Sequence, residues 1–112
     1  MENMNLRNYA YIGDAIWEVF IREKTIKITE NSKKLHKITT EKVKASFQAF
    51  LLQNLDEILT DEEKEIARRA RNLPIPIGRR HIQTEYRQAT AFEVLIGYFH
   101  EHDKERLIFV EN

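Results

Sequence analysis

Two apolar stretches of this chain each carry carboxylates in their interior, and no other feature constrains the fold as strongly. Residues 9–21 read YAYIGDAIWEVFI, in which only Asp14 and Glu18 are charged. Residues 89–99 read ATAFEVLIGYF, in which only Glu93 is charged. Both stretches have helical character. A carboxylate among apolar neighbours loses hydration and needs a partner, a proton or a cation.

A glycine lies close to an acid in each stretch. Gly13 directly precedes Asp14, and Gly97 follows Glu93 by one helical turn. Glycine at these points would allow the two helix backbones to approach closely and would bring the acids together. Two converging carboxylates in a dry groove are a plausible seat for a hard divalent ion. We therefore interpret Asp14 and Glu93 as a metal site.

The alternative interpretation of these acids is structural. Asp14 and Glu93 would then cap neighbouring helices or pair with an arginine such as Arg22 or Arg87. Glu18 lies one turn from Asp14 on the same face of the helix. A salt bridge is the simpler role for Glu18, and a supporting role behind the metal ligands is the other.

Composition predicts one helical domain spanning residues 1–112. Hydrophobic residues make up 42% of the chain and charged residues 32%, with only three glycines and two prolines. The absence of cysteine excludes disulfides and thiolate metal sites. The N-terminus has neither a basic start nor an apolar stretch, and no apolar run is long enough to span a membrane. We therefore expect a cytoplasmic protein.

Periodicity predicts five helices and no strand. The expected spans are about 5–24, 32–55, 61–72, 84–102 and 103–109, with Thr84 and Asp103 as caps of the last two. Residues 39–40 are both threonine and are expected to interrupt the second span. Thr60 and Glu63 fit a capping box at the start of the third. The prolines in residues 73–83 predict a loop.

The first expected helix is apolar on almost every side. Its two stripes are Leu6, Tyr9, Gly13, Ile16, Trp17 and Phe20 on one face, and Tyr11, Ile12, Ala15 and Val19 on the other. Such a helix must be buried on more than one side. In a chain this small a second protomer is the obvious cover, so we expect a homodimer.

Arginines cluster in one part of a chain whose net charge is zero. Six of the nine fall in residues 68–87, where Glu85 is the one acid. They are Arg68, Arg69, Arg71, Arg79, Arg80 and Arg87. Because the arginine fork suits phosphate oxygens, the cluster indicates an anionic partner. A solvated helix end is the alternative for the first three, but it does not cover Arg79 and Arg80.

The order of these motifs resembles a known family. Residues 11–15 (YIGDA) resemble the signature of the ribonuclease III catalytic domain, and residues 92–98 (FEVLIGY) resemble its second acidic helix. The chain is most similar to Mini-ribonuclease III, the bacterial form without a separate double-stranded-RNA-binding domain. Supporting details are Leu35-His36-Lys37, the Val43, Ala45 and Gln48-Ala49 pattern, residues 68–72 (RRARN) and Tyr86-Arg87.

The resemblance implies an all-α, ribonuclease III endonuclease-domain-like helical bundle that dimerises through its first long helix. It implies a Mg²⁺-dependent endoribonuclease, with Mn²⁺ as a substitute ion, that cuts double-stranded RNA into 5′-phosphate and 3′-hydroxyl ends. The implied task is maturation of 23S ribosomal RNA. Asp14 and Glu93 match metal-binding, catalytic positions of the family. The residues expected to bind RNA are Arg68, Arg69, Arg71, Asn72, Arg79, Arg80 and Arg87.

The chain departs from the general ribonuclease III pattern at two positions. Ala10 stands where that family usually has a glutamate, and Thr90 where it has an aspartate. Two acids per protomer remain, as in Mini-ribonuclease III, and Thr90 is left with a possible supporting role. These departures keep a rival open, a catalytically silent module that binds structured RNA or a ribosomal particle. A helical protein-interaction module is a second rival, but it leaves the paired acids unexplained.

Overall fold

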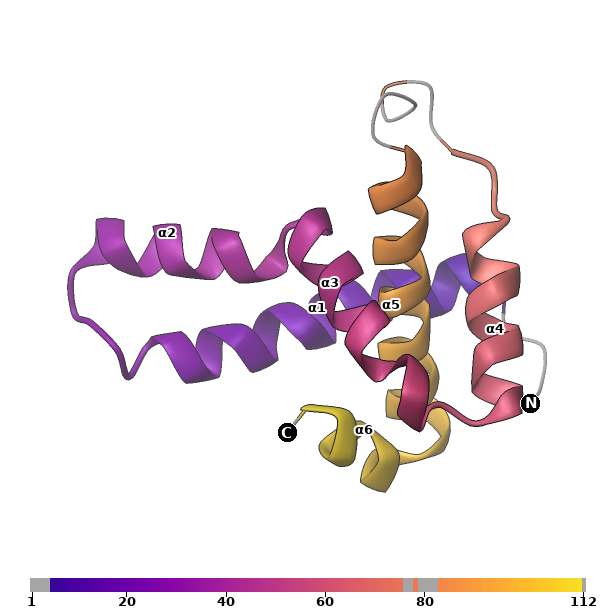
Figure 1. Cartoon of the computed structure of the whole chain (residues 1–112). Coiled ribbons are helices and arrows are strands. Elements are labelled where there is room, and N and C mark those ends of the chain that lie inside the picture. Colours follow the sequence, from indigo (N-terminus) through magenta and orange to yellow (C-terminus); the bar gives the residue numbers. More distant parts are fainter. Residues whose placement is uncertain (1–4, 76–77, 79–82, 112) are drawn as a thin grey trace.

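The computed structural model describes residues 5–75, 78 and 83–111 of the chain. These residues form six α-helices and one short 3₁₀-helix, without a strand (Figure 1). The helices are α1 (Leu6–Thr25), α2 (Ser32–Val43), α3 (Ala45–Leu55), η1 (Asp56–Ile58), α4 (Asp61–Arg71), α5 (Gln83–His102) and α6 (Lys104–Glu111). The all-α prediction is confirmed. Within the described residues no helix is both long and apolar enough to cross a membrane.

Helix α5 is the centre of the fold. It packs against α1, α3 and α4, which surround it in Figure 1. The residues that fill this core from α5 are almost all apolar, and they are Ala89, Ala91, Phe92, Val94, Leu95, Ile96, Gly97 and Phe99. Trp17 of α1 packs edge-on against Phe92, with 4.9 Å between ring centroids. Because the middle of α5 is enclosed on several sides, a charged residue there is held against apolar neighbours.

The end of α1 and the whole of α2 form an arm that extends from the rest of the molecule (Figure 1). The two helices pack side by side along this arm. Thr25 and Thr39 join them through a buried hydrogen bond between their hydroxyl oxygens, which lie 3.0 Å apart. This contact explains why the threonines at residues 39–40 do not end the helix. Their expected break is wrong, because the Thr39 hydroxyl bonds α1 instead of competing for its own backbone.

The break in the second predicted helix lies at Lys44, so the expected five helices become six. The backbone of Lys44 is extended, with φ −77° and ψ 160°. The indole N–H of Trp17 donates a hydrogen bond of 3.0 Å to the carbonyl oxygen of Lys42. A tertiary contact thus satisfies a carbonyl group at the end of α2, which a helix end would otherwise leave unpaired.

The other helix boundaries agree well with the pattern of capping residues. Thr60 and Glu63 form the expected capping box at the start of α4. Asp103 accepts a hydrogen bond from the backbone N–H of Arg106, as a cap for α6 should. The expected cap at Thr84 is wrong, because α5 already begins at Gln83. Of the predicted loop, residues 76–77 and 79–82 lie outside the described residues.

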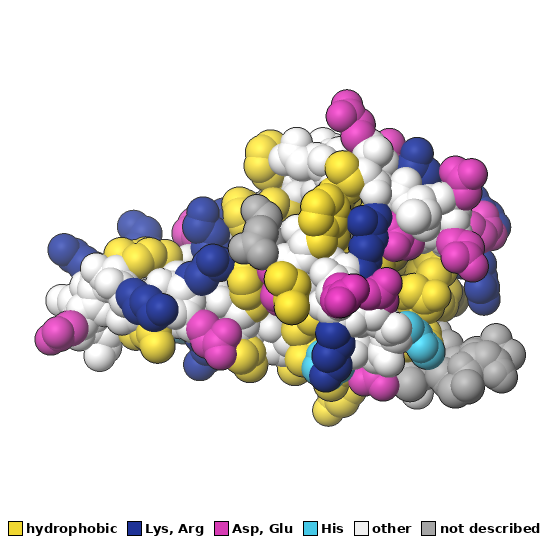
Figure 2. All heavy atoms as spheres, turned by 90° about the horizontal axis from the view of Figure 1, so that it is seen from below, with side chains coloured by type: hydrophobic (Ala, Val, Ile, Leu, Met, Phe, Trp, Pro, Cys, Tyr) yellow, Lys and Arg dark blue, Asp and Glu magenta, His cyan; other side chains and the backbone are white. Residues whose placement is uncertain are grey.

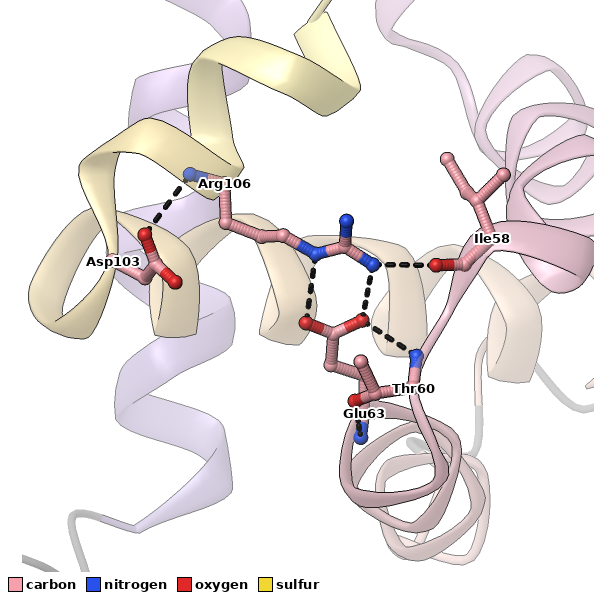
Figure 3. A network of polar contacts seen from close by, with 5 residues as sticks. All are labelled: Ile58, Thr60, Glu63, Asp103 and Arg106. Carbon is pink, nitrogen blue, oxygen red and sulfur yellow. Dashed lines mark hydrogen bonds and ion pairs between the residues drawn. The ribbon is translucent and has the colours of Figure 1, made fainter.

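An ion pair fastens α6 to the start of α4 (Figure 3). Arg106 donates from Nε and from one terminal nitrogen to the two carboxylate oxygens of Glu63, at 2.9 and 2.8 Å. The same guanidinium donates to the carbonyl oxygen of Ile58. Burial alone would raise the pKa of Glu63, but hydrogen bonds from Arg106 and the Thr60 backbone outweigh it, and the pKa is lowered. Every charge in this network therefore has a partner.

Candidate active site

Helices α1 and α5 touch through their backbones at two glycines. A Cβ atom built on Gly13 would lie 1.8 Å from the carbonyl oxygen of Glu93. A Cβ atom on Gly97 would lie 2.0 Å from the carbonyl oxygen of Tyr9. No side chain fits into such a gap, since real Cβ contacts lie well beyond 3 Å. The close approach that the glycines predicted is confirmed.

This crossing brings the acids of the two apolar stretches together. Burial raises the pKa of Glu93 most, and the charge and hydrogen bonding of Asp14 raise it further, to about 8. Glu93 is half-buried, whereas Asp14 is exposed. At neutral pH Glu93 therefore keeps its proton, and a cation bound beside the two acids would favour release of that proton. The expectation that residues 14 and 93 are neighbours in space is confirmed.

A third polar group faces this pair from α3. Gln48 is only 2% exposed, and its amide lies close enough to Glu93 to lower the pKa of that carboxyl. Its Nε2 atom makes no hydrogen bond within the described residues. In the sequence, Gln48 stands out only as part of a family pattern, with no predicted role of its own. The signal was weak, because one amide in a helix carries no chemical signature.

The site fits a divalent ion that keeps part of its water shell. The described residues contain no group of three or more His, Cys, Asp or Glu side chains that could surround a metal. Two carboxylates are enough for Mg²⁺, which binds one or two protein acids and retains several waters. The unpaired amide of Gln48 adds a donor for a water or a carboxylate oxygen at the same place.

The two residues with expected supporting roles have other neighbours in the structure. Glu18 pairs with Arg22 one turn further along α1, as its simpler interpretation predicted. Thr90 lines a small cavity with Arg7 and Arg87 at the C-terminal end of α4. Neither is among the groups that shift the pKa of Glu93.

The arginines of α4 lie at its C-terminal end, where positive side chains interact favourably with the negative end of the helix dipole. Arg68 makes a two-point ion pair with Glu65, and both side chains are exposed. Arg69 and Asn72 are exposed, and Arg71 is half-buried. Arg79 and Arg80 lie outside the described residues, so their expected RNA contacts stay predictions.

Arg87 occupies a structural position. Its guanidinium donates to the carbonyl oxygens of Arg71, at 2.5 Å, and Leu73, at 3.4 Å. Arg7 of α1 donates to the carbonyl oxygen of Pro74 nearby, at 3.2 Å. These bonds satisfy carbonyl groups that the end of α4 leaves open and fix the chain as it leaves that helix. The expected RNA-binding role of Arg87 stays a prediction. To bind RNA, Arg87 would have to contact it while also bonding these backbone carbonyl groups.

A second basic surface was missed by the sequence analysis. Residues 22–44, which we call the basic arm, contain eight lysines and arginines but only three acids. Figure 2 shows Lys and Arg side chains along this arm, which projects to the left. The signal was present in the chain, but the lysines are spread over 23 residues and are less conspicuous than the adjacent arginine pairs. Grouping on one projecting hairpin makes them a single charged surface.

Similarity to known proteins identifies the class to which this fold and this pair of acids belong. The ribonuclease III domain matches residues 7–104, and the chain belongs to that family. It is therefore an endoribonuclease by class. The family acts on double-stranded RNA and generally uses a divalent metal.

Its relatives include several short members of this family. The chain is 39% identical over 107 residues to the Mini-ribonuclease 3 of Gloeobacter violaceus, covering 96% of this chain and 79% of the relative. It is 40% identical over 103 residues to that of Enterococcus faecalis, covering 88% and 78%. A crystal structure of a protein from Fusobacterium nucleatum superposes with a TM-score of 0.87 at 33% identity, covering 99% of this chain and 91% of that one. The predicted resemblance is confirmed.

Proposed function

We propose that this chain is a Mg²⁺-dependent endoribonuclease that cuts double-stranded RNA and leaves 5′-phosphate and 3′-hydroxyl ends. Its proposed task is maturation of 23S ribosomal RNA in the cytoplasm. The observation that supports the proposal most is the backbone contact of Gly13 and Gly97 with the opposite helices. That contact brings Asp14 and Glu93, which are remote in sequence, to one place in the fold.

Asp14 and Glu93 are the residues that would hold the ion. When bound, Mg²⁺ lowers the pKa of a water and stabilises charge on the phosphate and on the departing 3′ oxygen. Glu93 has to release its proton before it serves as a ligand, because its pKa is about 8 without a cation. Asp14 is exposed and faces the solvent from which RNA arrives, whereas Glu93 anchors the site from the core.

The grip on RNA is assigned to two basic regions. The first is the C-terminal end of α4 with Arg68, Arg69, Arg71 and Asn72, joined by Arg79 and Arg80 of the following segment and by Arg87. The second is the basic arm. Both offer charge to phosphates. Because the major groove of A-form RNA is too narrow for side chains to read, recognition follows the shape of the duplex more than its base edges.

A homodimer through α1 fits the substrate. Tyr11 is 84% exposed and Val19 54% exposed, both on the outer face of α1. Large apolar side chains left in the open on one helix face are well suited to a second copy of the same face. A duplex has two strands related by local two-fold symmetry, and a two-fold dimer presents one pair of acids to each strand.

Incubation with an RNA duplex, with Mg²⁺ and with EDTA, tests the proposal. We expect cleavage only with Mg²⁺ and loss of cleavage in Asp14→Asn, with circular dichroism and dimer mass unchanged. Glu18→Gln is the matched control, because it removes a carboxylate one turn away that is already paired with Arg22. Retained cleavage by Asp14→Asn would show that the metal site is elsewhere.

The same experiment separates the rival function. A module that binds structured RNA without cutting it would shift the duplex in a gel and leave it intact with both Mg²⁺ and Mn²⁺. The replacement of two family acids by Ala10 and Thr90 is the observation that favours this rival. Cleavage by the unaltered protein would exclude it.

A further inference from the structure

The amide of Gln48 is an anomaly in an otherwise apolar region. The side chain is 2% exposed and lies on α3, which packs along α5. Its Nε2 atom is buried without a hydrogen-bond partner among the described residues. Buried polar groups in native proteins are almost always paired, so an orphaned one needs an explanation. It is also the one buried side-chain atom of this kind in the described part of the chain.

Packing alone does not explain the glutamine. Its neighbours in the core include the apolar residues Ala49 and Leu52 on the same helix. A methionine has nearly the same length and shape and would leave no donor unpaired. A polar group kept where an apolar one fits better indicates a function, because proteins break local rules mainly at functional sites.

The carboxyl group of Glu93 is the partner within reach. The amide lies close to it from α3, and Asp14 comes close to it from α1. Of the residues one turn from Glu93 on α5, Ala89, Ile96 and Gly97 have no side-chain donor. The fourth, Thr90, lines the cavity with Arg7 and Arg87. Gln48 on α3 is the amide donor that acts on this carboxyl group.

Resting on the proposed nuclease function, we propose that Gln48 is a positioning residue whose amide N–H holds the carboxylate of Glu93 in the orientation that binds the divalent ion. Ligating carboxylates in metal sites are usually held by a second hydrogen bond of this kind.

The neutrality of the amide suits this task. A lysine or arginine at the same place would also donate a hydrogen bond, but its positive charge would repel the cation and take its place beside the two acids. Glutamine donates without adding charge, so the negative potential of Asp14 and Glu93 is preserved for the ion.

The test is Gln48→Met, studied in metal-free protein, by direct Mn²⁺ binding and by cleavage. We expect the melting temperature without metal to be unchanged or higher, since a buried unpaired donor has been removed. We expect the dissociation constant for Mn²⁺, measured by electron paramagnetic resonance, to rise by about 10- to 100-fold. In duplex cleavage with Mg²⁺ we expect kcat to fall while KM for RNA stays the same.

Gln53→Met is the matched control. It makes the same substitution on the same helix, but the Gln53 amide is exposed and donates to Gln88 at the surface. Mn²⁺ binding and kcat should match those of the unaltered protein. If Gln48→Met also matches them, the positioning role is wrong even though the nuclease function stands. If the unaltered protein neither binds Mn²⁺ nor cuts the duplex, the proposed function itself fails.

A second variant guards against a packing artefact. Gln48→Leu removes the amide with a different shape and should show the same loss of Mn²⁺ affinity. A fall in melting temperature in both variants, with Mn²⁺ affinity and kcat unaltered at temperatures where they are folded, would assign Gln48 to packing and overturn the inference. Failure of both to fold would do the same.

Discussion

Two glutamates of this protein are shielded from solvent and meet opposite electrostatic environments. Glu63 at the start of α4 receives two hydrogen bonds from Arg106 and one from a backbone N–H. Its pKa is lowered, although burial by itself acts to raise it. Glu93 in the middle of α5 faces Asp14, and its pKa is raised to about 8, first by burial and then by that acid.

The difference separates stability from chemistry. The Glu63 network is satisfied by the chain itself, so it fastens one helix to another and needs nothing from solution. The chain supplies no positive partner for Glu93, so its ionised carboxylate beside Asp14 is unfavourable until a proton or a cation binds there. Perturbed carboxylates of the second kind are the ones that mark functional sites.

The largest effect is expected from Gly13→Ala, which attacks the crossing that Glu93 depends on. The added methyl group would lie 1.8 Å from a backbone oxygen that cannot move aside. We expect the free energy of unfolding to fall by about 3 kcal/mol, with complete loss of duplex cleavage. Urea denaturation and cleavage assays measure both. Gly78→Ala is the control, since no atom of the described residues lies within 4 Å of its added carbon.

Arg106→Met should disrupt the ion pair that stabilises Glu63. It leaves Glu63 without its partner in a position that is mostly shielded from water. We expect a loss of about 2–3 kcal/mol in unfolding free energy at pH 7, with cleavage unchanged well below the melting temperature. Arg68→Met removes an ion pair between two exposed side chains and should cost much less stability. Equal losses in the two variants would contradict the contrast between them.

The same variant carries a pH signature. Because the pKa of Glu63 is lower in the folded protein than its ordinary 4.5, its contribution is present above pH 4.5 and disappears as pH falls through the folded value. The stability gap between Arg106→Met and the unaltered protein should therefore narrow below pH 4.5. A gap that stays constant to the acid limit of folding would mean that Arg106 acts by packing alone.

Glu93→Gln should sharpen the comparison through a pH dependence of the opposite sign. Between pH 4.5 and about 8 the folded protein keeps the Glu93 proton and the unfolded chain releases it. In EDTA the unaltered protein should therefore lose stability as pH rises through this window. The glutamine variant should lack that loss and be more stable by about 2 kcal/mol at pH 8.5, after allowance for solvent screening. Parallel stability curves for the two proteins would refute this.

The smallest effect is expected on the basic arm, where charges are solvated and neither glutamate is disturbed. Lys33→Ala with Lys34→Ala removes two exposed charges from the start of α2. We expect weaker duplex binding and a salt dependence whose logarithmic slope falls by up to about 2. Melting temperature should not change. Lys64→Ala on α4, which lies among acids, is the control and should leave the slope unaltered.

Much of the fold was predictable because it follows from local patterns. The extent of α1 and the capping box at Thr60 and Glu63 were read from periodicity and from residue types that satisfy helix ends. The break at Lys44 was not predictable, since it accompanies a hydrogen bond to the carbonyl oxygen of Lys42 from Trp17, 25 residues before Lys42 in the chain. A tertiary contact of this kind leaves no trace in the local pattern.

The candidate site divides in the same way. Asp14 and Glu93 were predicted as a pair because each stands out among apolar neighbours and lies beside a glycine. Gln48 was missed as a functional residue because an amide has no charge to stand out. Arg87 was counted with the arginines that bind RNA, yet it satisfies backbone carbonyls at the end of α4. The three-dimensional structure is needed to distinguish an arginine that faces solvent from one that bonds backbone groups within the fold.

The close packing of α1 on α5 at the two glycines has a consequence for how the protein loses its activity and its fold on heating. Because the acids sit on segments pressed together without intervening side chains, a slow loosening of the centre has no room to occur ahead of global melting. Heat inactivation and the disappearance of helical signal should therefore follow one curve. We therefore expect no inactive folded state on heating, and the protein should stay active for as long as it stays folded.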